Sequence, residues 1–86
     1  MHPDEVVAAL RRRPFVPFRL HVADGSSYDI RHPELLWVTT RAAYVGLPAD
    51  PPGLLPERAV TVALGHVSRL EELPAAAKPG DGQQGA

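Results

Sequence analysis

Two short segments of alternating apolar and polar residues flank an Asp-Gly pair, and this arrangement constrains the fold most strongly. Residues 18–22 read FRLHV and residues 28–30 read YDI, so every second side chain on each segment is large and apolar. A period of two predicts β-strands with one buried face, and Asp24-Gly25 between them predicts a tight turn. The sequence therefore predicts an antiparallel β-hairpin.

The length of the turn follows from which residues would share a face. A two-residue loop would set apolar side chains opposite polar ones across the hairpin. A three-residue loop of residues 23–25 places Leu20 opposite Tyr28 and keeps one face apolar. Because a one-residue slip moves every side chain to the other face, we predict the longer loop, with Gly25 at positive φ in a bulge. Asp24 and Gly25 are then structural turn residues.

A short helix is expected before the hairpin, in the segment HPDEVVAALRRRP at residues 2–14. Pro3 suits the first helical position, and the acidic residues that follow it and the three Arg near the end suit the helix dipole. Val6, Val7 and Leu10 share one face. Since about ten residues form no stable helix alone in water, this helix must pack on the strands.

Further strands are expected after the hairpin. LLWVTTRAAYVGL, at residues 35–47, reads as two short strands around a turn near Thr40-Arg41, and AVTVAL at residues 59–64 alternates as a half-buried strand. The Pro-rich segment at residues 48–58 is a long loop. For GHVSRLEEL, at residues 65–73, a helical turn and a tight turn followed by a last strand are both consistent with the pattern.

One short helix and five short strands indicate a mainly β protein. We expect a small five-stranded SH3-like or Sm-like barrel with a short N-terminal helix, because closure removes strand edges that so short a chain cannot cover. We assign a single domain to residues 1–73. Residues 74–86 are rich in Pro, Gly, Ala and Gln without apolar periodicity, so we expect a disordered C-terminal tail.

The composition argues against several functional classes. Nine basic and ten acidic residues give a formal net charge of −1, which creates no field that attracts nucleic acid or a membrane. There is no cysteine, so disulfides and Cys-ligated zinc are excluded. No apolar stretch approaches the length of a membrane span, and the N-terminus is acidic where a signal peptide would be basic. We therefore expect a cytoplasmic protein without membrane contact.

The segment PFVPFRLHVADGSSYDIRHPE, at residues 14–34, resembles a group of small bacterial proteins. These share a Pro-Phe…Phe-x-Leu…Asp-Gly…Tyr-x-Val…His-Pro-Glu pattern, and the likeness, over residues 14–73, implies no activity. More distantly, the helix, the Asp-Gly hairpin and a late LGHVSRL are similar to the Sm-like barrel. Four residues would match its second motif: Leu64, Gly65, Val67 and Leu70. The base-binding Asp-x-x-x-Asn of Sm proteins is missing between Tyr28 and Trp37, so this resemblance implies a shape and not RNA binding.

Four histidines invite comparison with a metal site: His2, His21, His32 and His66. None has the His-x-x-x-His spacing or the Cys partners of common metal sites, so we expect exposed or capping imidazoles. His32 and His66 both lie at predicted turns that a barrel could bring together. We predict no metal site and no cofactor.

Ser26 and Ser27 lie close in sequence to Asp24 and His21, the residue types of a nucleophile with its acid and base. Catalysis needs a base held by packed neighbours and donors for the developing oxyanion, which a solvated hairpin tip does not supply. We predict a plain turn and no catalytic residue.

The sequence RRRPF, with Phe18 and Arg19 shortly after it, is the feature that most resembles a binding site. Its cations would be Arg11, Arg12, Arg13 and Arg19, and Phe15 and Phe18 would stack on single-stranded nucleic acid. In the alternative interpretation, the Arg residues cap the helix and both Phe side chains fill the core. We favour the alternative because the net charge is negative.

These observations predict a small interaction module that is not an enzyme and that associates with itself or with another protein. So small a core gains from burying further apolar surface, and the candidate contact residues are Trp37, Leu54 and Leu55. An Sm-like protein that binds single-stranded RNA is the alternative. A metal or enzyme site formed between subunits is a third possibility.

Overall fold

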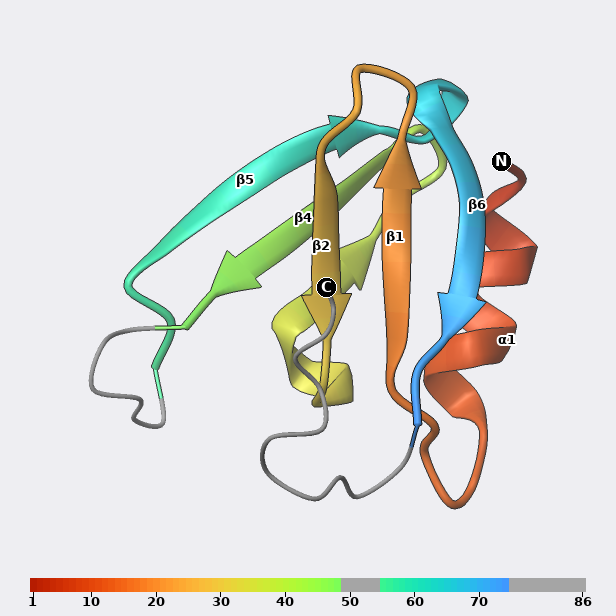
Figure 1. Ribbon diagram of the computed structural model, residues 1–86, viewed down its shortest axis with the longest axis vertical. Helices are drawn as coiled ribbons and strands as arrows, with labels where there is room; N and C mark the ends of the chain where they lie inside the picture. The colour runs from red at the N-terminus through yellow and green to blue at the C-terminus, as the bar shows by residue number, and fades with distance from the viewer. Residues whose placement is uncertain (49–54, 75–86) are drawn as a thin grey trace.

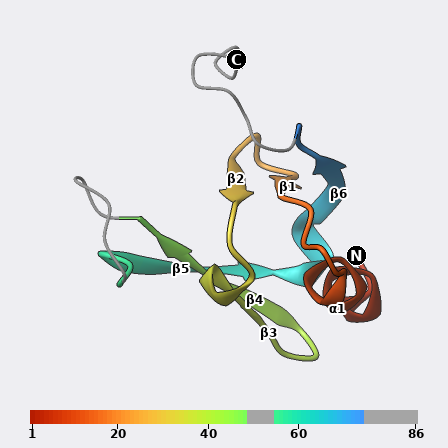
Figure 2. The same ribbon diagram turned by 90° about the horizontal axis from the view of Figure 1, so that it is seen from below.

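The computed structural model describes residues 1–48 and 55–74, and shows a mainly β fold with one α-helix (Figure 1). Its elements, with 3-10 helices named η, are α1 (Pro3–Arg11), β1 (Phe18–Val22), β2 (Ser27–Ile30), η1 (Pro33–Leu35), β3 (Leu36–Val38), β4 (Ala42–Leu47), β5 (Arg58–Ala63), η2 (Leu64–His66) and β6 (Val67–Glu72). The strands form two antiparallel sheets of three, with orders β2-β1-β6 and β3-β4-β5. The second sheet runs obliquely behind the first (Figures 1 and 2).

The structure confirms a mainly β fold, but it has six strands where the sequence predicted five, and it shows no closed barrel. Within residues 1–48 and 55–74 the strand pairing stays inside each sheet of three. The chain passes from one sheet to the other at two points: at η1, where Pro33 separates β2 from β3, and at η2, between β5 and β6. Because proline has no N–H to donate to a strand ladder, the chain cannot run through η1 as one continuous strand.

The hairpin and its register are confirmed. Leu20 pairs with Tyr28 and Phe18 with Ile30, as the three-residue loop requires. Gly25 has a φ of 95°, and its N–H donates to the Val22 carbonyl at 2.9 Å. The carboxylate of Asp24 accepts hydrogen bonds from the backbone N–H and the hydroxyl of Ser26, which lower the pKa of Asp24. Both residues therefore shape the turn.

The helix is also as predicted. It begins at Pro3, and the imidazole Nδ1 of His2 accepts a hydrogen bond from the Asp4 N–H at 3.2 Å, which caps the helix. Val6 is fully buried, and Leu10 packs against the same core. In Figure 1 the helix lies beside β6. Its stability comes from this packing, since nine residues form no stable helix in isolation.

The segment that the sequence left ambiguous forms both a helical turn and a strand. The turn is η2, and β6 follows it and pairs with β1. The first strand of the fold thus lies next to the last, with Leu20 opposite Leu70. A register shift near His21 and Val22 leaves Ser68 unpaired, and its hydroxyl donates to the His21 carbonyl at 3.1 Å.

The core lies between the two sheets and α1. Its fully buried large side chains are Phe18, Leu20, Ile30, Val6 and Val45. The predicted inward residues of the 59–64 strand are confirmed, since Val62 and Leu64 are buried and Val60 packs against the core. In the part of the chain that the structure describes, no polar or charged side chain is buried.

Some predictions concern residues that the structure does not describe. Residues 75–86 of the expected tail, residues 49–54 of the expected Pro-rich loop, and Leu54 all lie outside the described ranges. Across residues 1–48 and 55–74, no helix has both the length and the apolarity needed to span a bilayer.

Candidate interaction surface

The outward side of the β3-β4-β5 sheet presents an uncharged surface. Strand side chains alternate, so residues paired across the ladders share a side. The inward rows are apolar and at least partly buried, except at the end of the sheet, where the exposed Arg58 pairs with Leu47. The outward rows run Trp37–Tyr44–Thr61, Ala42–Ala63 and Gly46–Ala59. We call this set the aromatic face: Trp37, Ala42, Tyr44, Gly46, Ala59, Thr61 and Ala63.

Two aromatic side chains dominate this face. Trp37 is 74% exposed and Tyr44 is 38% exposed, although both are large apolar groups. Their rings lie side by side, with centroids 6.3 Å apart and planes tilted by 54°, a favourable geometry for an aromatic pair. They are held there by the β3-β4 turn, in which the Thr39 N–H donates to the Ala42 carbonyl at 2.8 Å. Two neighbouring aromatic rings are thus exposed on this face.

At the far end of the face, Gly46 allows a close approach of the segment that leads into β5. A Cβ added at Gly46 would lie 3.1 Å from the Cβ of Pro56 and 3.5 Å from Leu35. Pro56 and Leu35 therefore extend the apolar surface past Gly46. Leu55, a predicted contact residue, precedes Pro56 and is 78% exposed, so it adds further apolar surface at this end.

The outward side of the β2-β1-β6 sheet is of opposite character. Arg19 donates to the Asp29 carboxylate through Nε at 2.6 Å and through Nη2 at 3.2 Å. His21 Nε2 lies 2.8 Å from Glu71, and Arg31 lies 3.5 Å from Asp29. We call the outward residues paired across the strands of this sheet the charged face: Arg19, His21, Ser27, Asp29, Arg69 and Glu71.

The ion pairs of the charged face lower the pKa values of its two acidic groups. The hydrogen bond from Arg19 holds the pKa of Asp29 below its ordinary value, and the hydrogen bond from His21 does the same for Glu71. Arg19, Asp29, His21 and Glu71 are therefore paired within the chain, and their side chains are partly exposed. They keep the face soluble, and they do not concentrate one sign of charge.

The predicted nucleic-acid patch is only partly assembled. Phe18 is 2% exposed and belongs to the core, so its ring is not available for a base. Phe15 packs against the same core, with ring centroids 6.0 Å from Phe18. Arg19 is paired with Asp29, as described above. The Phe side chains thus have the structural role that the sequence favoured.

The three consecutive arginines lie at the C-terminal end of α1, and two of them bond to nearby parts of the chain. Arg13 donates to the carbonyls of Leu10 and Arg12 at 3.2 and 2.8 Å, and these are groups that the helix leaves without partners. Arg12 forms an ion pair with Glu72 of β6. Arg11 is exposed. Two of the three side chains are therefore engaged with the chain itself.

The histidine and serine candidates are not gathered into a site. His21 pairs with Glu71, His2 caps α1, and the hydroxyl of Ser26 donates to Asp24 at 2.6 Å. Ser27 is an exposed member of the charged face. His32 is exposed beside η1 and His66 is exposed in η2. Among residues 1–48 and 55–74, no three His, Cys, Asp or Glu side chains lie close enough to hold a metal ion.

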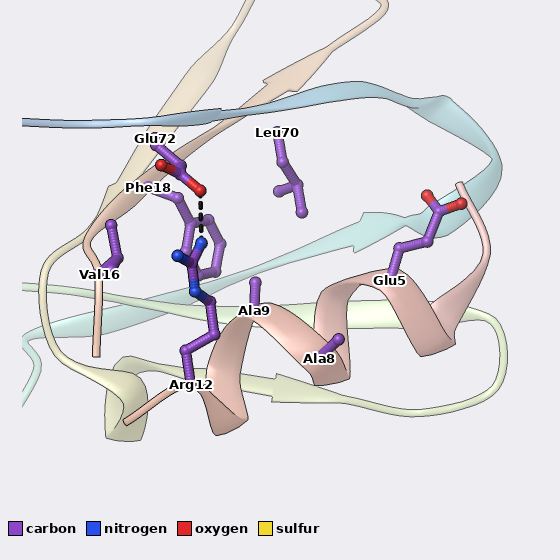
Figure 3. Close-up of a pocket in the computed structure, with 8 residues that line it drawn as sticks. All are labelled: Glu5, Ala8, Ala9, Arg12, Val16, Phe18, Leu70 and Glu72. Atoms are coloured by element: carbon purple, nitrogen blue, oxygen red, sulfur yellow. Dashed lines mark hydrogen bonds and ion pairs between the residues drawn. The ribbon is translucent and has the colours of Figure 1, made fainter. Parts of the chain in front are cut away.

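A groove of about 320 Å³ runs between α1 and β6 (Figure 3). Its lining is mainly apolar, and the ion pair between Arg12 and Glu72 crosses it. The residues that line it are Glu5, Ala8, Ala9, Arg12, Val16, Phe18, Leu70 and Glu72. The ion pair crosses the groove, and the helix lines it with the short side chains of Ala8 and Ala9. We therefore interpret the groove as space left where α1 packs beside β6.

Sequence reasoning named Trp37 and Leu55 as candidate contact residues, and both are exposed, but it did not name Tyr44 and Thr61, which lie in the same row as Trp37. A signal was present, because a turn at Thr40-Arg41 places Trp37 opposite Tyr44 by simple counting. The pairing of β4 with β5 spans a long connection, and its register could not be counted in the same way.

Comparison with known proteins adds no assignment. No protein-family model matches the chain, and neither the curated proteins nor the solved structures include one of significant similarity.

Proposed function

We propose that this protein is a non-enzymatic interaction module that associates with a second copy of itself through the aromatic face. The observation that carries the proposal is the contrast between its two outward sheet surfaces. One is covered by ion pairs, whereas the other exposes Trp37 and Tyr44 among Ala, Gly and Thr and has no charged member. Apolar patches of this kind mark contact sites on soluble proteins.

The energetics favour burial of this face. An exposed indole in water gains free energy when it enters an apolar contact, and Trp and Tyr are the side chains most enriched at energetically dominant positions of interfaces. The core of this domain is small, so the apolar area buried in a contact with a second copy would add substantially to the area that the fold buries by itself. A second copy is a partner of matching chemistry, because one uncharged face suits another of the same kind.

The SH3-like or Sm-like class expected from the sequence remains part of this proposal, as does a cytoplasmic location. The pairing of β1 with β6 supports the small-barrel class, because it places the first strand in the sequence beside the last. Single-stranded RNA binding is the alternative function. It has less support, since Phe18 is buried and Arg12 and Arg19 form ion pairs within the chain. A metal or enzyme site formed between copies is the third possibility and stays a prediction.

The test is the mass of the protein in solution, measured by light scattering after size-exclusion chromatography at about 1 to about 100 μM. We expect a mass of two chains of 9.3 kDa at the upper end of this range. Trp37→Glu, which puts a charge on the aromatic face, should give a monomer. Ser27→Glu puts the same charge on the charged face and should leave the dimer intact.

A monomeric parent protein over the whole range would contradict the proposal. So would a Trp37→Glu variant that keeps the parent mass. Because Trp37 is largely exposed, its replacement leaves the core untouched, and circular dichroism of the variant verifies that the chain is folded.

A further inference from the structure

The strand β5 offers a free edge next to the aromatic face. Among residues 1–48 and 55–74 it pairs with β4 on one side only, and in Figure 1 it forms the outer margin of its sheet. The other long edge strand, β6, is flanked by α1, and the ion pair between Arg12 and Glu72 spans the space between them. The short edge strand β3 also contacts α1. The remaining edge strand, β2, has only four residues, so β5 is the longest edge that the helix leaves uncovered.

The hydrogen-bond pattern shows which backbone groups of β5 point outward. The Leu64 N–H donates to the Arg41 carbonyl at 2.8 Å, so these two residues form a hydrogen-bonded pair. Such pairs alternate along an antiparallel ladder, and Val62 and Val60 therefore also bond to β4. The residues between them direct their N–H and carbonyl groups away from the sheet, and these are Ala59, Thr61 and Ala63.

We propose that two copies join through these edges, antiparallel, with the two-fold axis at Thr61. This inference rests on the proposed self-association and names another geometry for it, in which the contact lies at β5 and Trp37, on the opposite edge strand β3, stays outside the contact. Thr61 would lie opposite the Thr61 of the second copy, and Ala59 opposite Ala63. All three outward-pointing residues then meet outward-pointing residues of the other chain, so every free N–H in this stretch finds a carbonyl. The two sheets become one sheet of six strands.

The chemistry of β5 fits this arrangement. From Ala59 to Ala63 it has no charge and no proline, the features that natural edge strands use to prevent pairing. Glu57 and Arg58, two adjacent residues of opposite charge, lie outside this uncharged stretch, so they do not interrupt the pairing of Ala59 to Ala63. The Trp37–Tyr44–Thr61 row continues across the axis into its symmetry mate, so the two aromatic faces become one continuous surface with a Trp37 at each outer end.

Cysteine cross-linking tests the register directly, because the chain has no cysteine of its own. In the proposed pairing, the two Cα atoms at position 61 are about 5.5 Å apart, within the range for a disulfide. Thr61→Cys should therefore give a covalent dimer on mild oxidation. Ala59→Cys alone should not, since its two copies would be about 14 Å apart. A mixture of Ala59→Cys and Ala63→Cys chains should cross-link.

A second pair of variants tests the hydrogen bonds. Thr61→Pro removes only an N–H that points away from β4, and proline is tolerated at such edge positions. Thr61→Ala is the matched control and keeps the N–H. We expect a folded monomer for the proline variant and a dimer for the alanine variant, by the same light-scattering measurement.

The outcomes separate this inference from the proposed function. A covalent dimer with Thr61→Cys and with the mixture, but not with Ala59→Cys alone, supports it, even if the proline variant does not fold. Under edge pairing, Trp37→Glu should keep the dimer, because Trp37 lies outside the β5 contact. If Trp37→Glu instead disrupts the dimer and Thr61→Cys does not cross-link, the edge pairing is wrong and association through the aromatic face stands. If the parent is a monomer throughout, both proposals are wrong.

Discussion

The turn at Gly25 permits a quantitative test of the hairpin register. Gly25 has a φ of 95°, a region that residues with a Cβ rarely adopt, while nothing lies within 4 Å of the position that its Cβ would occupy. Gly65 also has open space around such a Cβ, but its φ is not positive. Alanine at either position therefore causes no clash, and the two variants differ in backbone strain alone.

The expected difference follows from the cost of positive φ. Alanine reduces the conformational entropy of the unfolded chain by the same amount in both variants, so that effect cancels in the comparison. The remaining cost of a left-handed conformation is about 1–2 kcal/mol. For a domain of this size, about 1 kcal/mol lowers the melting temperature by about 4–8 °C. We thus expect Gly25→Ala to melt about 4–16 °C below Gly65→Ala.

The assay is thermal unfolding followed by circular dichroism. All variants are measured at one protein concentration, because association raises the apparent stability. Gly25→Asn serves as an intermediate case, since asparagine tolerates positive φ better than alanine does. If Gly25→Ala and Gly65→Ala melt together, Gly25 is not held at positive φ and the three-residue loop is wrong.

Three other predictions follow from the described contacts. Val6→Ala should destabilise the fold by about 1–3 kcal/mol, because Val6 is fully buried. Arg12→Ala should cost at most about 1 kcal/mol, because the ion pair of Arg12 with Glu72 is exposed. Equal changes in melting temperature for the two variants would contradict the conclusion that α1 is held mainly by burial of Val6. The lowered pKa of Asp29, due mainly to its hydrogen bond from Arg19, stabilises the fold above the ordinary pKa of about 3.9, and this contribution is lost as the pH falls through the lowered value. The parent should therefore melt above Asp29→Asn by up to about 1 kcal/mol near neutral pH, and thermal unfolding as a function of pH should show the two curves converging in acid; a constant gap would refute the assignment. Single-stranded RNA should bind only non-specifically at physiological salt, with a Kd of about 10⁻⁴ to 10⁻⁶ M by fluorescence anisotropy; nanomolar binding with a salt dependence that weakens in Arg12→Ala and Arg13→Ala would favour the alternative function.

Local patterns were enough to predict much of this fold. The helix from Pro3 follows from its end residues and from the spacing of Val6 and Leu10, and the register of the first hairpin follows from parity across Asp24-Gly25. These features depend on neighbours within a few residues, so a single sequence contains the information. The turn near Thr40-Arg41 is of the same kind.

Features that depend on distant pairing could not be predicted in this way. The segment from Gly65 to Leu73 fitted a helical turn or a strand, and its pairing with β1, nearly fifty residues earlier, decided for η2 followed by β6. The expected closed barrel fails at Pro33 because a local break there outweighs the general advantage of covering edges. The aromatic face was found only in part, since its Thr61 row depends on the register between β4 and β5.

The fluorescence of Trp37 tests the central claim most directly, because it is the only tryptophan of the chain and the most exposed aromatic side chain of the aromatic face. Emission and quenching by a soluble quencher would be recorded against protein concentration, together with the mass from light scattering. We expect a red-shifted, strongly quenched indole at low concentration. Emission should move to the blue, and quenching should fall, over the concentration range in which the mass doubles. An indole that stays red-shifted and fully quenched while the mass doubles would contradict the claim that the aromatic face is where the copies meet.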